Sequence, residues 1–195
     1  MTTSQVLFVS FVALVALQRL AELRLSRRNE RQLRKLGARE HAPGHFIAMQ
    51  LLHTLWLVSV VLEVILLRPP LQPWVSVPAA LCFGLGQWLR YAALNALGGR
   101  WSVRILTLPG AAPVARGVYR YLRHPNYLGV VFEIAALPLM HSAWRSAVVF
   151  SLANAVLLVV RIREEERALT GNGGYHEALG PLPRFWPSFR PRGST

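Results

Sequence analysis

Residues 123–166 read RHPNYLGVVFEIAALPLMHSAWRSAVVFSLANAVLLVVRIREEE, and this stretch decides the fold. A basic turn leads into an apolar block, Tyr127 to Val160, which ends at a segment rich in arginine and glutamate. The block has thirty-four residues and is interrupted near Pro138 and His141-Ser142, which suits two membrane-spanning helices joined by a tight turn. Such a hairpin would bring its two polar ends together on one side of the bilayer.

The composition of the whole chain is that of a membrane protein. Of its 195 residues 53% are hydrophobic, and the mean hydropathy is +0.32. These values are too apolar for an ordinary soluble domain, and the length leaves room for one membrane bundle, so we expect a single domain over residues 1–195. The single cysteine excludes intrachain disulfides and a cysteine-based metal cluster, and no metal site is predicted.

Three further apolar blocks precede the hairpin. They run from about Val6 to Leu17, from Phe46 to Leu67 and from Trp74 to about Leu97. Together with the hairpin they predict an all-α integral membrane protein with about five transmembrane helices. Arg19 ends the first apolar block, and residues 19–40 are charged and rich in leucine and alanine, which favours a cytoplasmic or interfacial helix there.

The distribution of positive charge agrees with five helices. Segments 19–45, 98–125 and 161–195 hold eight, five and six basic residues, whereas the turns at 68–73 and 141–145 hold one each. The positive-inside rule then predicts that the N-terminus lies outside and the C-terminus in the cytoplasm, with the basic segments facing anionic membrane lipids. The net charge is +13, but its spread between apolar blocks argues against nucleic-acid binding.

Ionisable side chains inside the apolar blocks need a partner or access to water. Arg90 has two interpretations: a structural ion pair with Glu63 or Glu133, or a contact with a lipid headgroup or acidic substrate that enters sideways. Glu63 lies near the outer end of its block, where its carboxylate can reach the membrane interface. His53, Trp56 and Glu63 share one helical face, a spacing more typical of packing than of a site.

The Arg123-His124-Pro125 turn has the features of an anion site. Pro125 suits the first turn of a helix, because the helix would leave that amide unpaired in any case. The free amides of a helix N-terminus, next to Arg123 and His124, favour an anionic group. Gly117 and Gly129 permit the close approach of a ligand or of another backbone.

The Glu164-Glu165-Glu166 triplet supplies the opposite chemistry, since carboxylates bind hydroxyls and an ammonium. A ligand that carries a carboxylate, an ammonium and ribose hydroxyls would satisfy both ends of the hairpin. S-adenosylmethionine is such a ligand, and we expect it as the cofactor.

These motifs resemble those of the isoprenylcysteine carboxyl methyltransferase family and its phospholipid methyltransferase relatives. The resemblance covers about residues 86–190, the expected catalytic part, and residues 1–85 look like the N-terminal helices of the short bacterial members. It rests on two motifs in the family's order, Gly117-x-Tyr119 … Arg123-His124-Pro125-x-Tyr127-x-Gly129 and Arg161-Ile162-x-x-Glu165-Glu166-x-x-Leu169, followed by Tyr175. It implies a methyltransferase of the bacterial inner membrane with a cytosolic cofactor pocket and a lateral opening for a lipophilic acceptor.

The resemblance also implies roles for individual residues. The family lines its cofactor site with the His-Pro-x-Tyr turn and the paired glutamates. The expected cofactor-binding residues, with their neighbours in the motifs, are therefore Gly117, Tyr119, Arg123, His124, Pro125, Tyr127, Gly129, Glu165 and Glu166. An arginine in a Leu-Arg-x-Ala context lies near the acceptor in the family, and Leu89-Arg90-Tyr91-Ala92 reproduces that context, so Arg90 is the expected catalytic residue.

The identity of the methyl acceptor stays open. A carboxylate, as in isoprenylcysteine, is nucleophilic at neutral pH, whereas a lipidic phenol, with a pKa of about 10, would gain from a base that the sequence does not identify. N-methylation of an aminolipid headgroup is the alternative reaction, and a small membrane scaffold or transporter is the non-enzymatic alternative. The apolar blocks and the lack of a glycine-rich motif after a strand disfavour a soluble Rossmann-type methyltransferase. The oligomeric state is not indicated.

Overall fold

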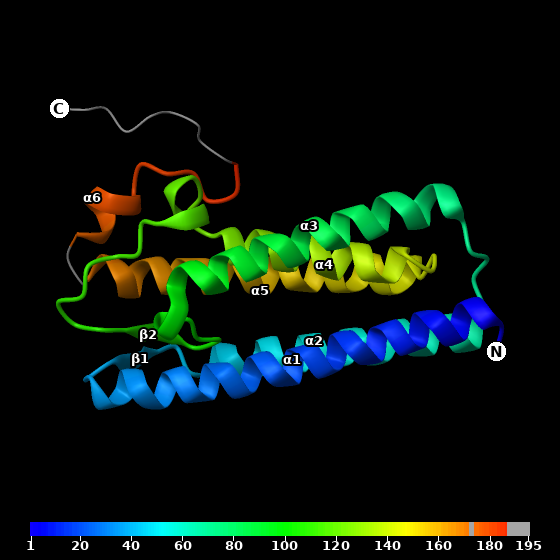
Figure 1. Ribbon diagram of the computed structural model, residues 1–195, viewed down its shortest axis with the longest axis horizontal. Coiled ribbons are helices and arrows are strands. Elements are labelled where there is room, and N and C mark those ends of the chain that lie inside the picture. Colours follow the sequence, from blue (N-terminus) through cyan, green and yellow to red (C-terminus); the bar gives the residue numbers. More distant parts are fainter. Residues whose placement is uncertain (172–173, 187–195) are drawn as a thin grey trace.

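The computed structural model describes residues 1–171 and 174–186 and is mostly helical (Figure 1). The elements in chain order are α1 (Thr3–Lys35), β1 (Arg39–His41), α2 (Gly44–Leu67), α3 (Pro73–Leu97), η1 (Gly98–Arg100), β2 (Ile105–Thr107), η2 (Gly117–Arg120), α4 (Pro125–Leu139), α5 (Trp144–Thr170) and α6 (Tyr175–Leu179). The five long helices run along the molecule, α1 with α2 in one layer and α3, α4 and α5 in the other. The N-terminus lies at one end, and β1, β2 and α6 lie at the opposite end.

Three helices, α1, α2 and α5, are long and apolar enough to cross a membrane. Helix α4 is apolar but has only 15 residues, and α3 has 25 residues that include the charged Arg90. The chain is thus a helical integral membrane protein, as predicted, while the count of five spans stays a prediction. Leu14, Leu55 and Leu152, on the outer faces of α1, α2 and α5, are 63%, 58% and 65% exposed, which is typical of side chains that face lipid.

Helix α1 is one continuous helix of 33 residues, so it does not end at Arg19, and the helix expected within residues 19–40 is its second half, which ends at Lys35. The helix starts with a capping box formed by Thr2 and Gln5 and contains neither glycine nor proline. One face of its charged half packs into the bundle, where Glu22 and Asn29 are buried, while Arg24, Arg27 and Arg28 are exposed. Arg19, whose charge suggested the end of the span, is paired with Glu22 and Glu133 within the protein.

A two-stranded antiparallel ribbon, which the predicted all-α fold did not include, joins β1 to β2. Arg39 pairs with Thr107 and His41 with Ile105, and Nε2 of His41 lies 2.8 Å from the Thr107 hydroxyl. Each strand has three residues, which is too short for an alternation of polar and apolar side chains to reveal it. The ribbon ties the segment after α1 to the segment between α3 and α4.

Helices α4 and α5 form the predicted hairpin, and Ser142 in the turn has a left-handed backbone with φ 55°. Glu63 of α2 caps the start of α5. Its carboxylate accepts hydrogen bonds from the amides of Arg145 and Ser146 at 3.1 and 2.7 Å, and from the Ser146 hydroxyl at 2.6 Å. Because the first amides of a helix lack intrahelical partners, this contact anchors the hairpin turn to α2.

Helices α3 and α4 cross closely at two glycines. A Cβ added to Gly86 would lie 2.9 Å from the carbonyl oxygen of Gly129, and a Cβ added to Gly129 would lie 2.7 Å from that of Gly86 and 2.6 Å from Cγ of Arg90. Neither position has room for a side chain. Gly129 therefore serves the approach of another backbone, one of its two predicted uses, and this approach brings Glu133 beside Arg90.

Candidate active site

The two predicted motifs meet at the end of the bundle where α4 begins and α5 ends. Nε2 of His124 lies 3.0 Å from Oε1 of Glu166, a residue 42 positions later, and the Tyr127 hydroxyl donates a hydrogen bond to Glu165. The rings of His124 and Tyr127 stack, with centroids 5.4 Å apart and an interplanar angle of 24°. The hairpin thus assembles one polar cluster from two distant segments.

Arg161 of α5 holds Tyr127 in this cluster. Its Nε donates to the Tyr127 hydroxyl at 2.8 Å, and its Nη2 donates to the carbonyl oxygen of Val103 at 2.6 Å. The guanidinium also lies 5.7 Å from the centroid of the Tyr127 ring, and the side chain is buried. Arg161 was not among the predicted site residues. The sequence feature that could have identified Arg161 is its position: it is the first charged residue after the apolar block that ends at Val160.

The carboxylate of Glu166 occupies the anion site predicted at the start of α4. It lies 3.2 Å from Nη1 of Arg123 and 3.0 Å from Nε2 of His124, and it accepts two hydrogen bonds from Arg184 at 2.9 and 2.5 Å. The amides of Arg123 and His124 donate to the carbonyl oxygens of Pro183 and Arg184, so these amides are not free for a ligand. Glu166 and these backbone bonds clamp the C-terminal segment onto the start of α4.

Two cavities adjoin the cluster. The first has a volume of about 460 Å³ and runs between α1 and α2 toward the motifs; among its lining residues are Arg19, Leu20, Glu22, Leu23, His53, Leu57, Val58, Arg90, Tyr127 and Arg161. The second has a volume of about 170 Å³ and is lined by β2, by the segment that follows it and by α6. Tyr119, Arg123, His124 and Glu165 line both cavities, so these four residues lie on the boundary that the cavities share.

Two tyrosines near Glu165 keep their protons far above neutral pH. Burial raises the pKa of Tyr119 well above 10.0, and the negative charge of Glu165 adds to the shift. Burial, followed by the charges of Glu165 and Glu166, raises the pKa of Tyr175 from 10.0 to about 12. Both phenols line the second cavity as neutral groups that can donate a hydrogen bond.

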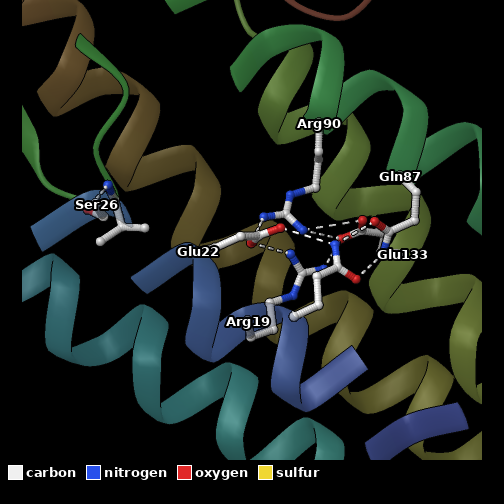
Figure 2. Close-up of polar contacts among 8 residues, drawn as sticks. Arg19, Glu22, Ser26, Gln87, Arg90 and Glu133 are labelled. Atoms are coloured by element: carbon white, nitrogen blue, oxygen red, sulfur yellow. Dashed lines mark hydrogen bonds and ion pairs between the residues drawn. The ribbon is translucent and has the colours of Figure 1, made fainter. Parts of the chain in front are cut away.

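Arg90 belongs to a closed ring of ion pairs inside the bundle, which we call the charge ring: Arg19, Glu22, Arg90 and Glu133 (Figure 2). Arg90 lies 2.5 Å from Glu22 and 3.2 Å from Glu133, and Arg19 lies 2.9 Å from Glu22 and 2.5 Å from Glu133. Two arginines and two glutamates balance in charge. The pairing of Arg90 with Glu133 was one of the two predicted for it, whereas Glu63 lies at the far end of α2.

The cavities divide the predicted site residues into two groups. Six of them line the first cavity, namely Arg90, Tyr119, Arg123, His124, Tyr127 and Glu165. The other four, Gly117, Pro125, Gly129 and Glu166, line neither of these two cavities. Gly117 has φ 57° at the start of η2, and Pro125 is buried in the first turn of α4. These four residues shape the site, and their contact with a cofactor stays a prediction.

Unpaired polar atoms indicate that the first cavity suits a polar ligand. Among the described residues, Nε of Arg19, Arg90 and Arg123 and Oδ1 of Asn126 are buried without a hydrogen-bond partner, and these side chains line this cavity. Buried polar atoms are normally paired, so the unpaired donor of Arg123 and the unpaired acceptor of Asn126, three residues apart, favour a ligand that supplies the partners. Glu165 and Tyr119 add a carboxylate and a neutral hydroxyl at the same boundary.

Comparisons with known proteins are consistent with this arrangement. Residues 79–171 match the Isoprenylcysteine carboxyl methyltransferase (ICMT) family, a range that holds the charged residue of α3 and both motifs. The chain is 39% identical over 145 residues to the uncharacterized protein YpbQ of Bacillus subtilis (strain 168), covering 74% of this chain and 86% of that relative. It is 35% identical over 71 residues to an uncharacterized protein of Haemophilus influenzae, covering 36% of this chain and 41% of that relative.

Proposed function

Because the chain belongs to the isoprenylcysteine carboxyl methyltransferase family, we propose that it transfers a methyl group from S-adenosylmethionine to an oxygen of a lipophilic acceptor. Family membership makes the protein a membrane methyltransferase. The cofactor, the acceptor and the residues that bind them are the proposal. The acceptor oxygen belongs either to a carboxylate of the isoprenylcysteine type or to a lipidic phenol.

The observation that carries this proposal is the boundary shared by the two cavities. The first cavity is lined on one side by Leu20 and Leu23 of α1 and by Leu57 and Val58 of α2, an apolar surface that suits a lipid chain. Leu20 and Val58 are also 53% and 50% exposed, so this cavity reaches the lipid-facing surface of the bundle. A lipid can therefore enter from the membrane and present its head to the polar end.

The polar end has the groups that a sulfonium nucleotide requires. The carboxylate of Glu165 can bind an ammonium or a ribose hydroxyl, while Arg123, His124 and Tyr119 can donate to a carboxylate. All four residues lie at the boundary that the two cavities share. A methyl donor in the second cavity would there face a methyl acceptor in the first. Tyr127, held by Arg161, forms the adjoining wall of the first cavity.

Methyl transfer from a sulfonium is an in-line displacement, so the protein contributes position and exclusion of water rather than a covalent intermediate. S-adenosylmethionine supplies the activated methyl group. The clamp formed by Glu166, Arg123, His124 and Arg184 fixes the boundary residues, and the charge ring keeps Arg90 at the wall of the acceptor cavity. The reaction then needs the acceptor oxygen, the methyl carbon and the sulfur in line across the boundary.

We place the site on the cytoplasmic side of a bacterial inner membrane, with the N-terminus outside. The support is the distribution of charge, because segments 19–45, 98–125 and 161–195 hold nineteen of the 22 basic residues. The end of α1, the segment between α3 and α4 and the end of α5 lie together at the motif end of the bundle (Figure 1). Fusion of a periplasmic or cytoplasmic reporter to the C-terminus of residues 1–195 tests this orientation. A reporter that is active only in the periplasm would contradict it.

The experiment that tests the proposal is the binding of S-adenosylhomocysteine to the detergent-purified protein, followed by transfer of a labelled methyl group to a panel of lipids. We expect binding, and we expect Glu165→Gln to weaken it about 10- to 100-fold, because a hydrogen bond to a charged group contributes roughly 1.5–3 kcal/mol. Glu164→Gln is the matched control, since Glu164 pairs with Arg167 on the outer surface of α5.

Three outcomes would count against the proposal. The protein fails as a methyltransferase of this kind if S-adenosylhomocysteine does not bind to folded wild-type protein. Equal affinities of the Glu165→Gln and Glu164→Gln variants would remove Glu165 from the cofactor site. Methylation of the amine of an aminolipid headgroup, with no labelled ester or ether formed, would replace O-methylation by the alternative reaction.

A further inference from the structure

His53 of α2 faces the first cavity with one ring nitrogen committed and the other free. Its Nδ1 lies 2.8 Å from the carbonyl oxygen of Met49, one turn earlier in the helix, and the side chain lines the cavity. A carbonyl oxygen only accepts hydrogen bonds, so Nδ1 carries the proton. In the neutral ring Nε2 is then a lone pair, and no hydrogen bond to it is formed within residues 1–171 and 174–186.

The position of the His53 ring is fixed by its neighbours. The ring packs edge-on against Trp56, with centroids 6.2 Å apart, which holds its plane. Arg19 of α1 and Arg161 of α5 line the same cavity. His53 therefore presents an oriented imidazole to the cavity and is not only a packing residue, as its helical face predicted.

Other acceptors line the first cavity, but they have other partners or are not bases. Glu22 is bound by Arg19 and Arg90 in the charge ring. Nε2 of His124 is bound to Glu166, and Glu165, which accepts from Tyr127 with one oxygen, is the group assigned above to the cofactor. The amide oxygen of Asn126 is unpaired but is not a base, whereas Nε2 of His53 is a basic atom without a partner among the described residues.

The charge ring bears on the class of acceptor that this cavity takes. Arg19 and Arg90 are each bound by two glutamates, so the ring offers no uncompensated charge to an ionised carboxylate, whereas Arg161, bound by the neutral Tyr127 hydroxyl and the Val103 carbonyl, keeps its charge. A neutral hydroxyl needs no cation, but it needs a group that takes its proton. His53 gives the cavity the group that a hydroxyl acceptor requires.

We propose that His53 is the proton acceptor for a lipophilic acceptor that carries a hydroxyl, an inference that rests on the proposed function. The hydroxyl proton passes to Nε2 of His53 as the oxygen forms its bond to the methyl carbon. The bond between that carbon and the sulfonium sulfur breaks, and its electron pair stays on sulfur. The products are a methyl ether, a neutral thioether and an imidazolium, which releases its proton to water as the products leave.

The test compares two acceptors of equal alkyl chain length, a phenol and a carboxylic acid, with labelled S-adenosylmethionine. We expect wild-type protein to methylate the phenol and His53→Phe to lower kcat for it about 100-fold or more, the range for loss of a general base. The affinity for S-adenosylhomocysteine should stay within about twofold of wild type, because His53 lines only the first of the two cavities. His45→Phe, the same change on the same helix at a residue that lines neither cavity, is the control and should leave kcat within about threefold.

A second readout separates a base from a packing residue. Phenols made more acidic by ring fluorines are partly ionised at the assay pH, so the loss caused by His53→Phe should shrink as their pKa falls. A loss that is the same for every phenol, or equal for the phenol and the carboxylic acid, would overturn the assignment of His53 and leave the methyltransferase intact. Wild-type protein that methylates only the carboxylic acid would also overturn it. Failure of wild-type protein to bind S-adenosylhomocysteine would refute the proposed function and, with it, this inference.

Discussion

The charge ring and the cluster of the two motifs both consist largely of arginine and glutamate, and they are built in opposite ways. The charge ring lies within the bundle, and each of its four side chains is bound by two others of opposite charge (Figure 2). The motif cluster, made of Arg123, His124, Tyr127, Arg161, Glu165, Glu166 and Arg184, lies where α4 begins and α5 ends, and it borders both cavities.

The difference indicates which cluster can bind a ligand. The ring is closed and charge-balanced, so it joins α1, α3 and α4 and presents Arg90 to the cavity with its charge compensated. The motif cluster holds three arginines against two glutamates, and its members Arg123, His124 and Glu165 line both cavities. Charged residues inside a membrane protein are therefore functional in two senses: one set holds helices together, and the other remains available to a ligand.

The largest effect is expected from opening the ring. Glu133→Gln leaves Arg19 and Arg90 with one carboxylate between them at a site where the Glu133 side chain is 1% exposed. Loss of one member of a buried ion pair costs about 3–5 kcal/mol, so we expect a large fall in the thermal unfolding temperature of the detergent-purified protein. Glu164→Gln, which breaks an exposed pair with Arg167, should cost less than about 1 kcal/mol. Similar unfolding temperatures for the two variants would show that the ring does not hold the bundle together.

The next effect tests how the ring is assembled. Gly86→Ala places a methyl group 2.9 Å from the Gly129 carbonyl oxygen, which forces α3 and α4 apart, and overpacking of this kind costs about 1–3 kcal/mol. Gly84→Ala on the same helix is the matched control, because a Cβ there meets nothing within 4 Å. Thermal unfolding of both variants measures the difference. If Gly84→Ala proved as destabilising as Gly86→Ala, the close crossing would not be the cause.

A smaller effect is expected in the motif cluster. Glu166→Gln removes the charge that Arg123, His124 and Arg184 share, and we expect a loss of about 1 kcal/mol, since Arg184 is half exposed. Hydrogen exchange should quicken at the amides of Arg123 and His124, which donate to the C-terminal segment. Glu165→Gln should leave the exchange rates of these two amides unchanged. If exchange quickened in Glu165→Gln and not in Glu166→Gln, then Glu165, not Glu166, would hold the C-terminal segment.

The smallest effect concerns pH. The pKa of Tyr175 is raised in the folded protein from 10.0 to about 12, so its contribution to stability is complete below pH 10 and is lost as the pH rises toward about 12. The tyrosinate absorbance of the folded protein should therefore show a late step, and Tyr175→Phe should reduce that step by one tyrosine. If Tyr175→Phe left the rise in absorbance near pH 12 unchanged, Tyr175 would ionise near pH 10, as exposed tyrosines do.

The hairpin and its polar ends were predictable because their signals are local. A thirty-four-residue apolar block with a break near Pro138 can cross a membrane only as two helices, and antiparallel helices bring their outer ends together. His124 and Glu166 therefore meet as expected. The ribbon and the continuity of α1 were missed, since three-residue strands carry no period and the charges after Leu17 looked like the end of a span.

The sequence by itself determined a basic-ended helical membrane protein with two motifs at one end, because composition, apolar length and charge distribution are properties of the chain alone. Only the tertiary structure decided which charges are paired. The close approach of α3 to α4 at Gly86 and Gly129 places Arg90 beside Glu133 in the charge ring. The packing of α1 against α2 places His53 at the wall of the first cavity. The physical reason is that the energy of a buried charge depends on the partners that distant helices bring to it.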